Sequence, residues 1–88
     1  MIGKFATSKA GHDQNTVYVI VAEEGDNVFL CDGKYKTLLK PKKKRKKHIQ
    51  IIHQTVGEEV LLKLRNHEKI MDEQIKFEIK LLKQNHKN

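Results

Sequence analysis

Residues 40–48 carry the side chains whose type and spacing most clearly suggest a chemistry. This stretch reads KPKKKRKKH and holds seven of the 18 Lys and Arg residues of the chain. Outside it, 11 Lys or Arg residues face 11 Asp or Glu residues, so the formal net charge of +7 resides in these nine positions. Cations packed this closely repel one another unless an anion neutralises them, and a chain of phosphates does so while releasing counterions. The run therefore predicts a polyanion-binding site that contacts phosphate without reading base sequence.

Three other interpretations of the same run stay open. It could be a solvated charge run with no partner. The hexapeptide 41–46, PKKKRK, is also typical of a nuclear-localisation signal. An anionic membrane surface is the third, but a polybasic run needs a lipid or apolar anchor for stable attachment, and none adjoins this one. We therefore expect RNA as the partner and no membrane.

Other chemistries find little support in the sequence. The five histidines (12, 48, 53, 67 and 86) and the lone Cys31 show no ligand spacing typical of structural zinc, so we expect no metal or cofactor. No P-loop, GxSxG or HExxH motif is present, and we expect neither an enzyme nor a small-molecule substrate. Asp13 and Asp32 are expected to bind backbone in turns, and Cys31 to be a core residue. Tyr18, Phe29 and Tyr35 could stack on bases; the core is favoured for Phe29, and Tyr35 stays open between the two.

Strands are expected on both sides of the basic run. β-branched and aromatic residues predict strands at 2–7, 16–22, 28–31, 35–39 and 48–53, with a turn at 24–27 and a two-residue hairpin at Asp32-Gly33. The segment 16–22 is apolar on both faces, as in a small barrel. Pro41 and the adjacent like charges disfavour a regular central strand. We expect residues 40–48 to be a loop or ragged strand end that the fold does not need, so that replacing its lysines leaves folding intact.

From Thr55 onward the apolar period becomes helical. Thr55-Val56-Gly57-Glu58 has the spacing of a capping box, and Asp72-Glu73 could cap a second helix. Two helices, at about 57–66 and 72–84, are favoured over a single one. Their apolar stripe comprises Val60, Leu64, Met71, Ile75, Ile79 and Leu82.

This helical tail could cover an open end of the barrel, bind a ribosomal protein or a second copy, or be disordered. Residues 56–88 hold seven Lys or Arg against six Asp or Glu. With charges so nearly balanced, we expect the tail to add little to phosphate binding.

The sequence lacks features of membrane and secreted proteins. No 18-residue apolar run predicts a membrane span, and the first residues, MIGKFATSKAG, have no apolar signal-peptide region. A single cysteine permits no internal disulfide. We expect a cytoplasmic protein.

The segment 8–15, SKAGHDQN, followed by the apolar residues 17–21, resembles the KOW motif of ribosomal proteins and transcription-elongation factors. The CDGK turn at 31–34, the Lys-rich run and His48-Ile49 are similar to bacterial KOW-domain RNA-binding proteins, which are related to the archaeal and eukaryotic fourteenth large-subunit ribosomal protein. The resemblance covers about residues 1–54 and leaves the tail, 55–88, outside it. Asn15 stands where the family commonly has a second glycine.

The resemblance implies a mainly β fold: an SH3-like barrel of about five strands, here with a C-terminal helical extension. It also implies a ribosome-associated protein that contacts ribosomal RNA of the large subunit. A KOW-type protein-interaction module, with polymerase or a ribosomal protein as main partner, is the alternative. Together the basic run and the motif give the expected RNA-binding set: Lys9, Gly11, His12, Lys34, Lys40, Lys42, Lys43, Lys44, Arg45, Lys46, Lys47 and His48.

Overall fold

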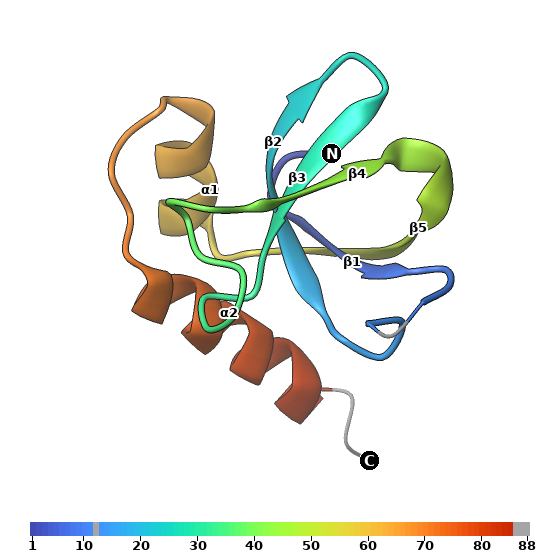
Figure 1. The fold of residues 1–88 in the computed structure, drawn as a ribbon. Coiled ribbons are helices and arrows are strands. Elements are labelled where there is room, and N and C mark those ends of the chain that lie inside the picture. The colour runs from blue at the N-terminus through green and yellow to red at the C-terminus, as the bar shows by residue number, and fades with distance from the viewer. Residues whose placement is uncertain (12, 86–88) are drawn as a thin grey trace.

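The computed structural model describes residues 1–11 and 13–85, and its centre is a curved antiparallel sheet (Figure 1). The strand order is β4-β3-β2-β1-β5, so β4 and β5 are the two edges. The expected fold class, mainly β with about five strands and a helical C-terminal part, is confirmed. No ladder joins β4 to β5 within the described residues, so the sheet is open rather than a closed barrel. The strands are β1 (Lys4–Ser8), β2 (Tyr18–Glu24), β3 (Asn27–Cys31), β4 (Lys42–Arg45) and β5 (Ile49–Thr55).

The hairpin of β2 and β3 forms where the sequence predicts it. Glu24 pairs with Asn27, and Gly25 takes a positive φ of 59° in the turn between them. The register shifts between Ile20 and Ala22, so β2 has one extra residue there. After this bulge Glu23 lies opposite Val28. The Glu23 side chain therefore lies on the same face as Val28, whereas simple alternation from Val19 would place it on the other face.

The prediction of a tight hairpin at Asp32-Gly33 and a strand at 35–39 is wrong. The Asp32 carboxylate instead accepts hydrogen bonds from three successive backbone N–H groups, those of residues 34, 35 and 36, at 2.8–2.9 Å. These bonds satisfy locally the groups that a hairpin partner would otherwise take. The loop then lies against α2 (Asp72–Asn85), where the Leu38 N–H donates to Asp72 Oδ1 at 2.9 Å.

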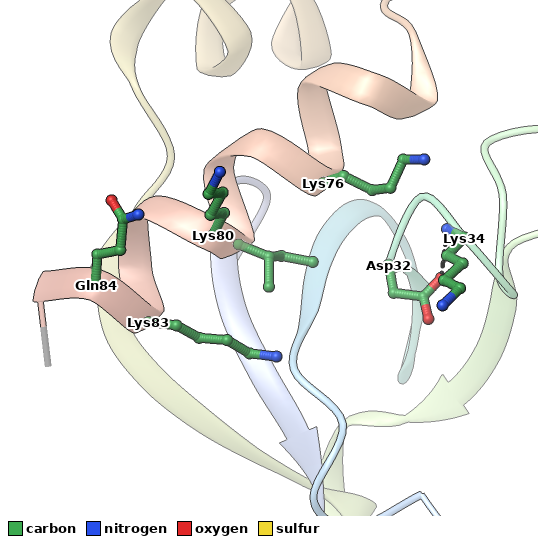
Figure 2. A pocket seen from close by; sticks show the side chains of 7 residues that line it. Asp32, Lys34, Lys76, Lys80, Lys83 and Gln84 are labelled. Carbon is green, nitrogen blue, oxygen red and sulfur yellow. Dashed lines mark hydrogen bonds between the residues drawn. The ribbon is translucent and has the colours of Figure 1, made fainter. Parts of the chain in front are cut away.

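Gly33 allows this loop to approach the helix closely (Figure 2). Its φ is +80°, and a Cβ at this position would lie 2.5 Å from the Asp72 carbonyl oxygen and 2.8 Å from Lys76 Cγ. Any other residue would therefore push the loop away from α2.

The prediction of a loop or ragged strand end across the basic run is wrong for residues 42–45, which form a regular strand. These residues form strand β4, which pairs with β3 through the whole of its length. The expectation that these residues would not form a central strand holds, because β4 is an edge of the sheet. Pro41, which has no backbone N–H to donate, precedes the strand. A short 3₁₀ turn, η1 (Lys46–His48), leads from β4 into β5.

Two helices follow the sheet, as the sequence predicts: α1 (Glu58–Arg65) and α2 (Asp72–Asn85). The predicted capping box is wrong, because Thr55 belongs to β5 and pairs with Lys4. Gly57 is the N-cap of α1 instead, and its N–H donates to Glu78 Oε1 of α2 at 3.0 Å. Before α2, the Met71 N–H donates to Gln74 Oε1 at 2.9 Å, while Asp72 turns to the Leu38 N–H.

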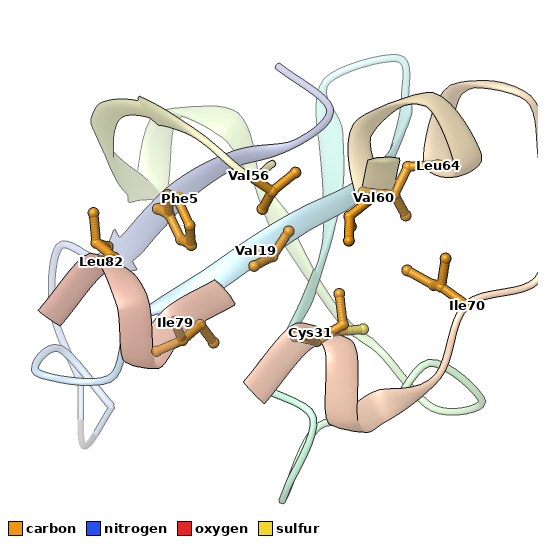
Figure 3. Packing of buried hydrophobic residues seen from close by; sticks show 10 residues of the cluster. Phe5, Val19, Cys31, Val56, Val60, Leu64, Ile70, Ile79 and Leu82 are labelled. Carbon is orange, nitrogen blue, oxygen red and sulfur yellow. The ribbon is translucent and has the colours of Figure 1, made fainter. Parts of the chain in front are cut away.

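The helices are joined to the sheet by a shared apolar core (Figure 3). Of the predicted stripe, only Met71 is exposed, at 52%. The helices fold back as one alternative for the tail predicts, but they cover a face of the sheet rather than an open end. Burial of Cys31 raises the pKa of its thiol to about 12, as fits a core residue. The shared core consists of Phe5, Val19, Cys31, Val56, Val60, Leu64, Ile70, Ile75, Ile79 and Leu82.

A second core lies on the other face of the sheet. It brings Ile49 of β5 together with Val28 and Leu30 of β3, although β2 and β1 separate these strands in the sheet. The sheet must therefore curl around this core in the manner of a barrel. Alternating residues of β2 supply both cores, with Val19 in the first and Tyr18 and Ile20 in the second.

Candidate nucleic-acid interface

Strand β4 presents its cations alternately to two faces. Lys42 and Lys44 lie opposite Leu30 and Val28, on the face of the second core, and both are half-buried. Half-buried lysines on an apolar face can bury their aliphatic stems while the ammonium groups stay in water. Lys43 and Arg45 are exposed on the other face. One strand thus supplies cations to both sides of the sheet edge.

Lys42 is held by an internal ion pair with Asp13. Tyr18 Oη and Ser8 Oγ donate to the same Asp13 oxygen, Oδ2, at 3.0 and 3.2 Å. The Lys42 Nζ also lies 5.9 Å from the centre of the Tyr18 ring. The Lys42 hydrogen bond holds the pKa of Asp13 at about 2, and burial together with Asp13 raises the pKa of Tyr18 to about 12. Asp13 therefore binds side chains here, rather than the backbone that its place in a turn predicts.

Lys46 is likewise engaged within the protein. Its Nζ lies 3.0 Å from Glu23 Oε2, and the N-terminal amine of Met1 lies 2.8 Å from Oε1 of the same carboxylate. The amine and Lys46 together lower the pKa of Glu23. Two of the seven cations of the basic run, Lys42 and Lys46, therefore anchor the run to the rest of the sheet. These ion pairs lead us to expect that Lys42 and Lys46, unlike the other cations of the run, support the fold.

The other cations of the run lie where a partner can reach them. Lys44 and His48 line a groove of about 250 Å³ with Lys9 and Ala10, and the Lys9 N–H donates to the His48 carbonyl oxygen at 3.0 Å. The sheet thus brings the loop after β1 next to the basic run, as the predicted set requires. No ion pair between the described residues includes these cations. We call this surface the basic edge: Lys9, Lys43, Lys44, Arg45, Lys47 and His48.

Some residues of the predicted set lie elsewhere. Lys34 lies on the loop against α2, apart from the basic edge, and Lys40 is exposed on the crossover into β4. Gly11 has a φ of +102°, a conformation that bends the loop between Lys9 and Asp13. His12 lies outside the described residues.

The three candidate stacking residues differ in how far their side chains are exposed. Tyr18 is 3% exposed and belongs to the second core. Phe29 is half-buried and lies outside both cores, so the core prediction is only partly met. Tyr35 is 76% exposed and remains available to a base.

Asp13, Tyr18 and Glu23 were not identified as residues that order the site. The sequence holds no local signal for Asp13, because it lies 29 positions from Lys42 and only the fold brings the two together. The role of Glu23 is hidden by the bulge in β2, because the bulge places the Glu23 side chain on a face of the sheet that simple alternation does not predict.

No metal site emerges from the residues that the structure describes, which contain no group of three His, Cys, Asp or Glu side chains close enough to hold an ion. Over the same residues, no helix is long and apolar enough to cross a bilayer. Among known proteins, no family model matches the chain and no curated protein matches it.

Proposed function

We propose that this is a small RNA-binding protein that grips the phosphate backbone with its basic edge. The observation that carries this proposal is the ordered row of unpaired cations along β4 and η1, next to Lys9. A cation fixed by a strand loses less entropy on binding than one on a free tail. Phosphate contacts of this kind give affinity and orientation but little base specificity.

The excess positive charge of the chain lies in the basic run, because acidic and basic residues balance in number outside it. With Lys42 and Lys46 already paired to carboxylates, the basic edge offers five exposed or half-exposed Lys and Arg side chains to phosphate: Lys9, Lys43, Lys44, Arg45 and Lys47. His48, which is exposed beside them, adds a hydrogen-bond donor.

Ribosomal RNA of the large subunit is the RNA that we propose, on the resemblance of residues 1–54 to KOW-domain proteins. The curved sheet and the position of Lys9 and Asp13 beside the basic run are compatible with it. Association with the ribosome in the cytoplasm is part of the same proposal.

A protein-interaction module, with polymerase or a ribosomal protein as main partner, is the second candidate. The observation that favours it is the exposure of large apolar side chains: Leu39 is 93% exposed, and Met71 and Phe77 are more than half exposed. Apolar side chains left in water often mark a protein interface.

Ribosome co-sedimentation at graded salt, together with titration of naked RNA, separates the two candidates. If about five cations contact phosphate, log K falls against log salt with a slope of about −3.5 to −4.5, at roughly 0.7–0.9 per contact. A slope flatter than about −1 for naked RNA, with salt-resistant binding to intact ribosomes or to polymerase, would favour the protein-interaction module instead.

A further inference from the structure

A second group of cations lies where the loop after β3 meets α2. Lys76, Lys80 and Lys83 of α2 and Lys34 of the loop line a groove of about 580 Å³ (Figure 2), and Ile79 is its apolar lining residue. Asp32 and Gln84 complete the lining. The three helix lysines are exposed, as is Lys34.

The helix aligns these lysines in a row. Positions 76, 80 and 83 follow the i, i+4, i+7 spacing of one helix face, and at 1.5 Å per residue they extend over about 10 Å. Among the described residues, no ion pair includes any of the four lysines. The single acidic group of the lining, Asp32, uses one of its oxygens to accept three backbone N–H groups. Such a row suits a chain of phosphates better than one small anion.

The loop that carries Lys34 is fixed in place. Gly33, which is buried, permits contact with the first turn of α2, and the bond from the Leu38 N–H to Asp72 holds the other end of the loop. Both walls of the groove are therefore ordered parts of the fold.

An exposed aromatic ring adjoins this groove. Lys34 Nζ lies 5.0 Å from the centre of the Tyr35 ring, and Tyr35 is 76% exposed. A tyrosine left in water beside a row of cations is the arrangement by which proteins stack on unpaired bases while contacting the backbone.

We infer that this groove is a second RNA-binding surface, which takes an unpaired segment with its phosphates along Lys76, Lys80 and Lys83 and a base on Tyr35. An unpaired segment is required because a base in a duplex has no free face for the ring. The inference rests on the proposed function, since the same RNA is held at the basic edge. The two surfaces share no residue, because the basic edge lies on β4, η1 and the loop after β1, whereas the groove is formed by α2 and the loop after β3. Lys44 lies on the face of the sheet opposite α2, and Lys43 and Arg45 lie on the other face. This inference differs from the expectation that residues 55–88 add little to phosphate binding. Their acidic and basic residues balance in number, but α2 places three lysines in one row.

The test compares a blunt RNA hairpin with the same hairpin bearing an unpaired tail. The wild-type chain should bind the tailed RNA more tightly. Replacing Lys76, Lys80 and Lys83 by Gln should remove most of this advantage and flatten the salt slope for the tailed RNA by about 2, at roughly 0.7 per contact with a single strand. Tyr35→Ala, which changes no charge, should reduce the advantage about tenfold, as expected for one stacked base.

A variant with Gln at Lys63, Arg65 and Lys69 is the matched control, because it loses the same charge from α1 and the segment after it. It should keep the advantage of the tailed RNA. If the groove variant and Tyr35→Ala bind tailed RNA as the wild type does, or if the control loses as much, the inference is overturned while the proposed function stands. The inference is also overturned if an acidic peptide, and not the unpaired segment of the RNA, occupies the groove. Absence of salt-dependent binding to either RNA would instead overturn the proposed function itself.

Discussion

Asp13 and Lys42 are 29 positions apart in the sequence and form an ion pair that fastens the loop after β1 to the first residue of β4. Because Tyr18 and Ser8 donate to the same carboxylate oxygen, the pair is part of a hydrogen-bonded cluster rather than an isolated surface contact. Such clusters contribute more than single exposed ion pairs.

Removing either partner of this pair should therefore destabilise the protein. We expect Asp13→Asn and Lys42→Gln each to lower the free energy of unfolding by about 2 kcal/mol, as for a hydrogen bond to a charged group. The two changes together should cost less than their sum, because either one removes the same interaction. Urea unfolding measures this. Lys43→Gln, the neighbouring cation on the other face, is the control and should stay within about 0.5 kcal/mol of wild type. Equal effects at Lys42 and Lys43 would contradict the special role of the pair.

The same cluster should make stability depend on acid. The pKa of Asp13 is about 2 in the folded protein against an ordinary 3.8, so the unfolded chain takes up the proton first as the pH falls. The stabilisation is thus fully present above about pH 5 and is lost as the pH falls through 4 towards 2, a difference of roughly 2 kcal/mol. Unfolding of the wild type and of Asp13→Asn should be compared from pH 2 to 6. Their difference should shrink towards pH 2; a constant difference would mean that the charge of Asp13 is not what stabilises.

The basic edge should be separable into cations that bind and cations that support. Replacing Lys43, Lys44, Arg45 and Lys47 by Gln should flatten the salt slope of RNA binding by about 3 and leave the free energy of unfolding nearly unchanged. Replacing Lys42 and Lys46 by Gln should mainly reduce stability, because both are paired to carboxylates. Titration at several salt concentrations and thermal unfolding of both variants test this division. The reverse pattern would show that the assignment of the two sets is wrong.

The helices should be needed for the stability of the sheet. Ile75 is fully buried in the shared core, so Ile75→Ala should lower the free energy of unfolding by about 3 kcal/mol. Phe77→Ala removes a larger side chain from the same helix but from a site that is 56% exposed, and should cost less than about 1 kcal/mol. Denaturant unfolding of the two variants gives the comparison. Similar losses would mean that α2 is not packed as described.

Much of the fold follows from local patterns in the sequence. The runs of β-branched and aromatic residues locate β1, β2, β3 and β5, and the helical stripe locates both helices to within a few residues. The basic edge was also predictable, because seven cations in nine positions leave little doubt about where positive charge gathers.

What the sequence hid depends on contacts between distant segments. Residues 42–45 were expected to form a loop because their charges oppose strand pairing, yet β3 offers an unpaired edge and Asp13 neutralises one of the lysines. Asp32 was expected to be a hairpin residue because Asp-Gly favours a two-residue turn, whereas its carboxylate caps three local N–H groups and the loop lies against α2 at Gly33. The lysine row of α2 was overlooked because counting charges over the tail ignores the helical face on which they lie.

The sharing of one core between β1 and α2 has a consequence for how the chain folds. Phe5 and Leu82 belong to the same cluster, so most of the sequence must be present before that cluster can close. Before two segments so far apart can form stabilising contacts, the long stretch of chain between them must lose conformational entropy. This cost slows folding. During synthesis, the face of the sheet that bears Phe5, Val19 and Cys31 therefore stays exposed until α2 has emerged. We expect the nascent sheet to be vulnerable to aggregation in that interval, and the late appearance of α2 to be the step that ends it.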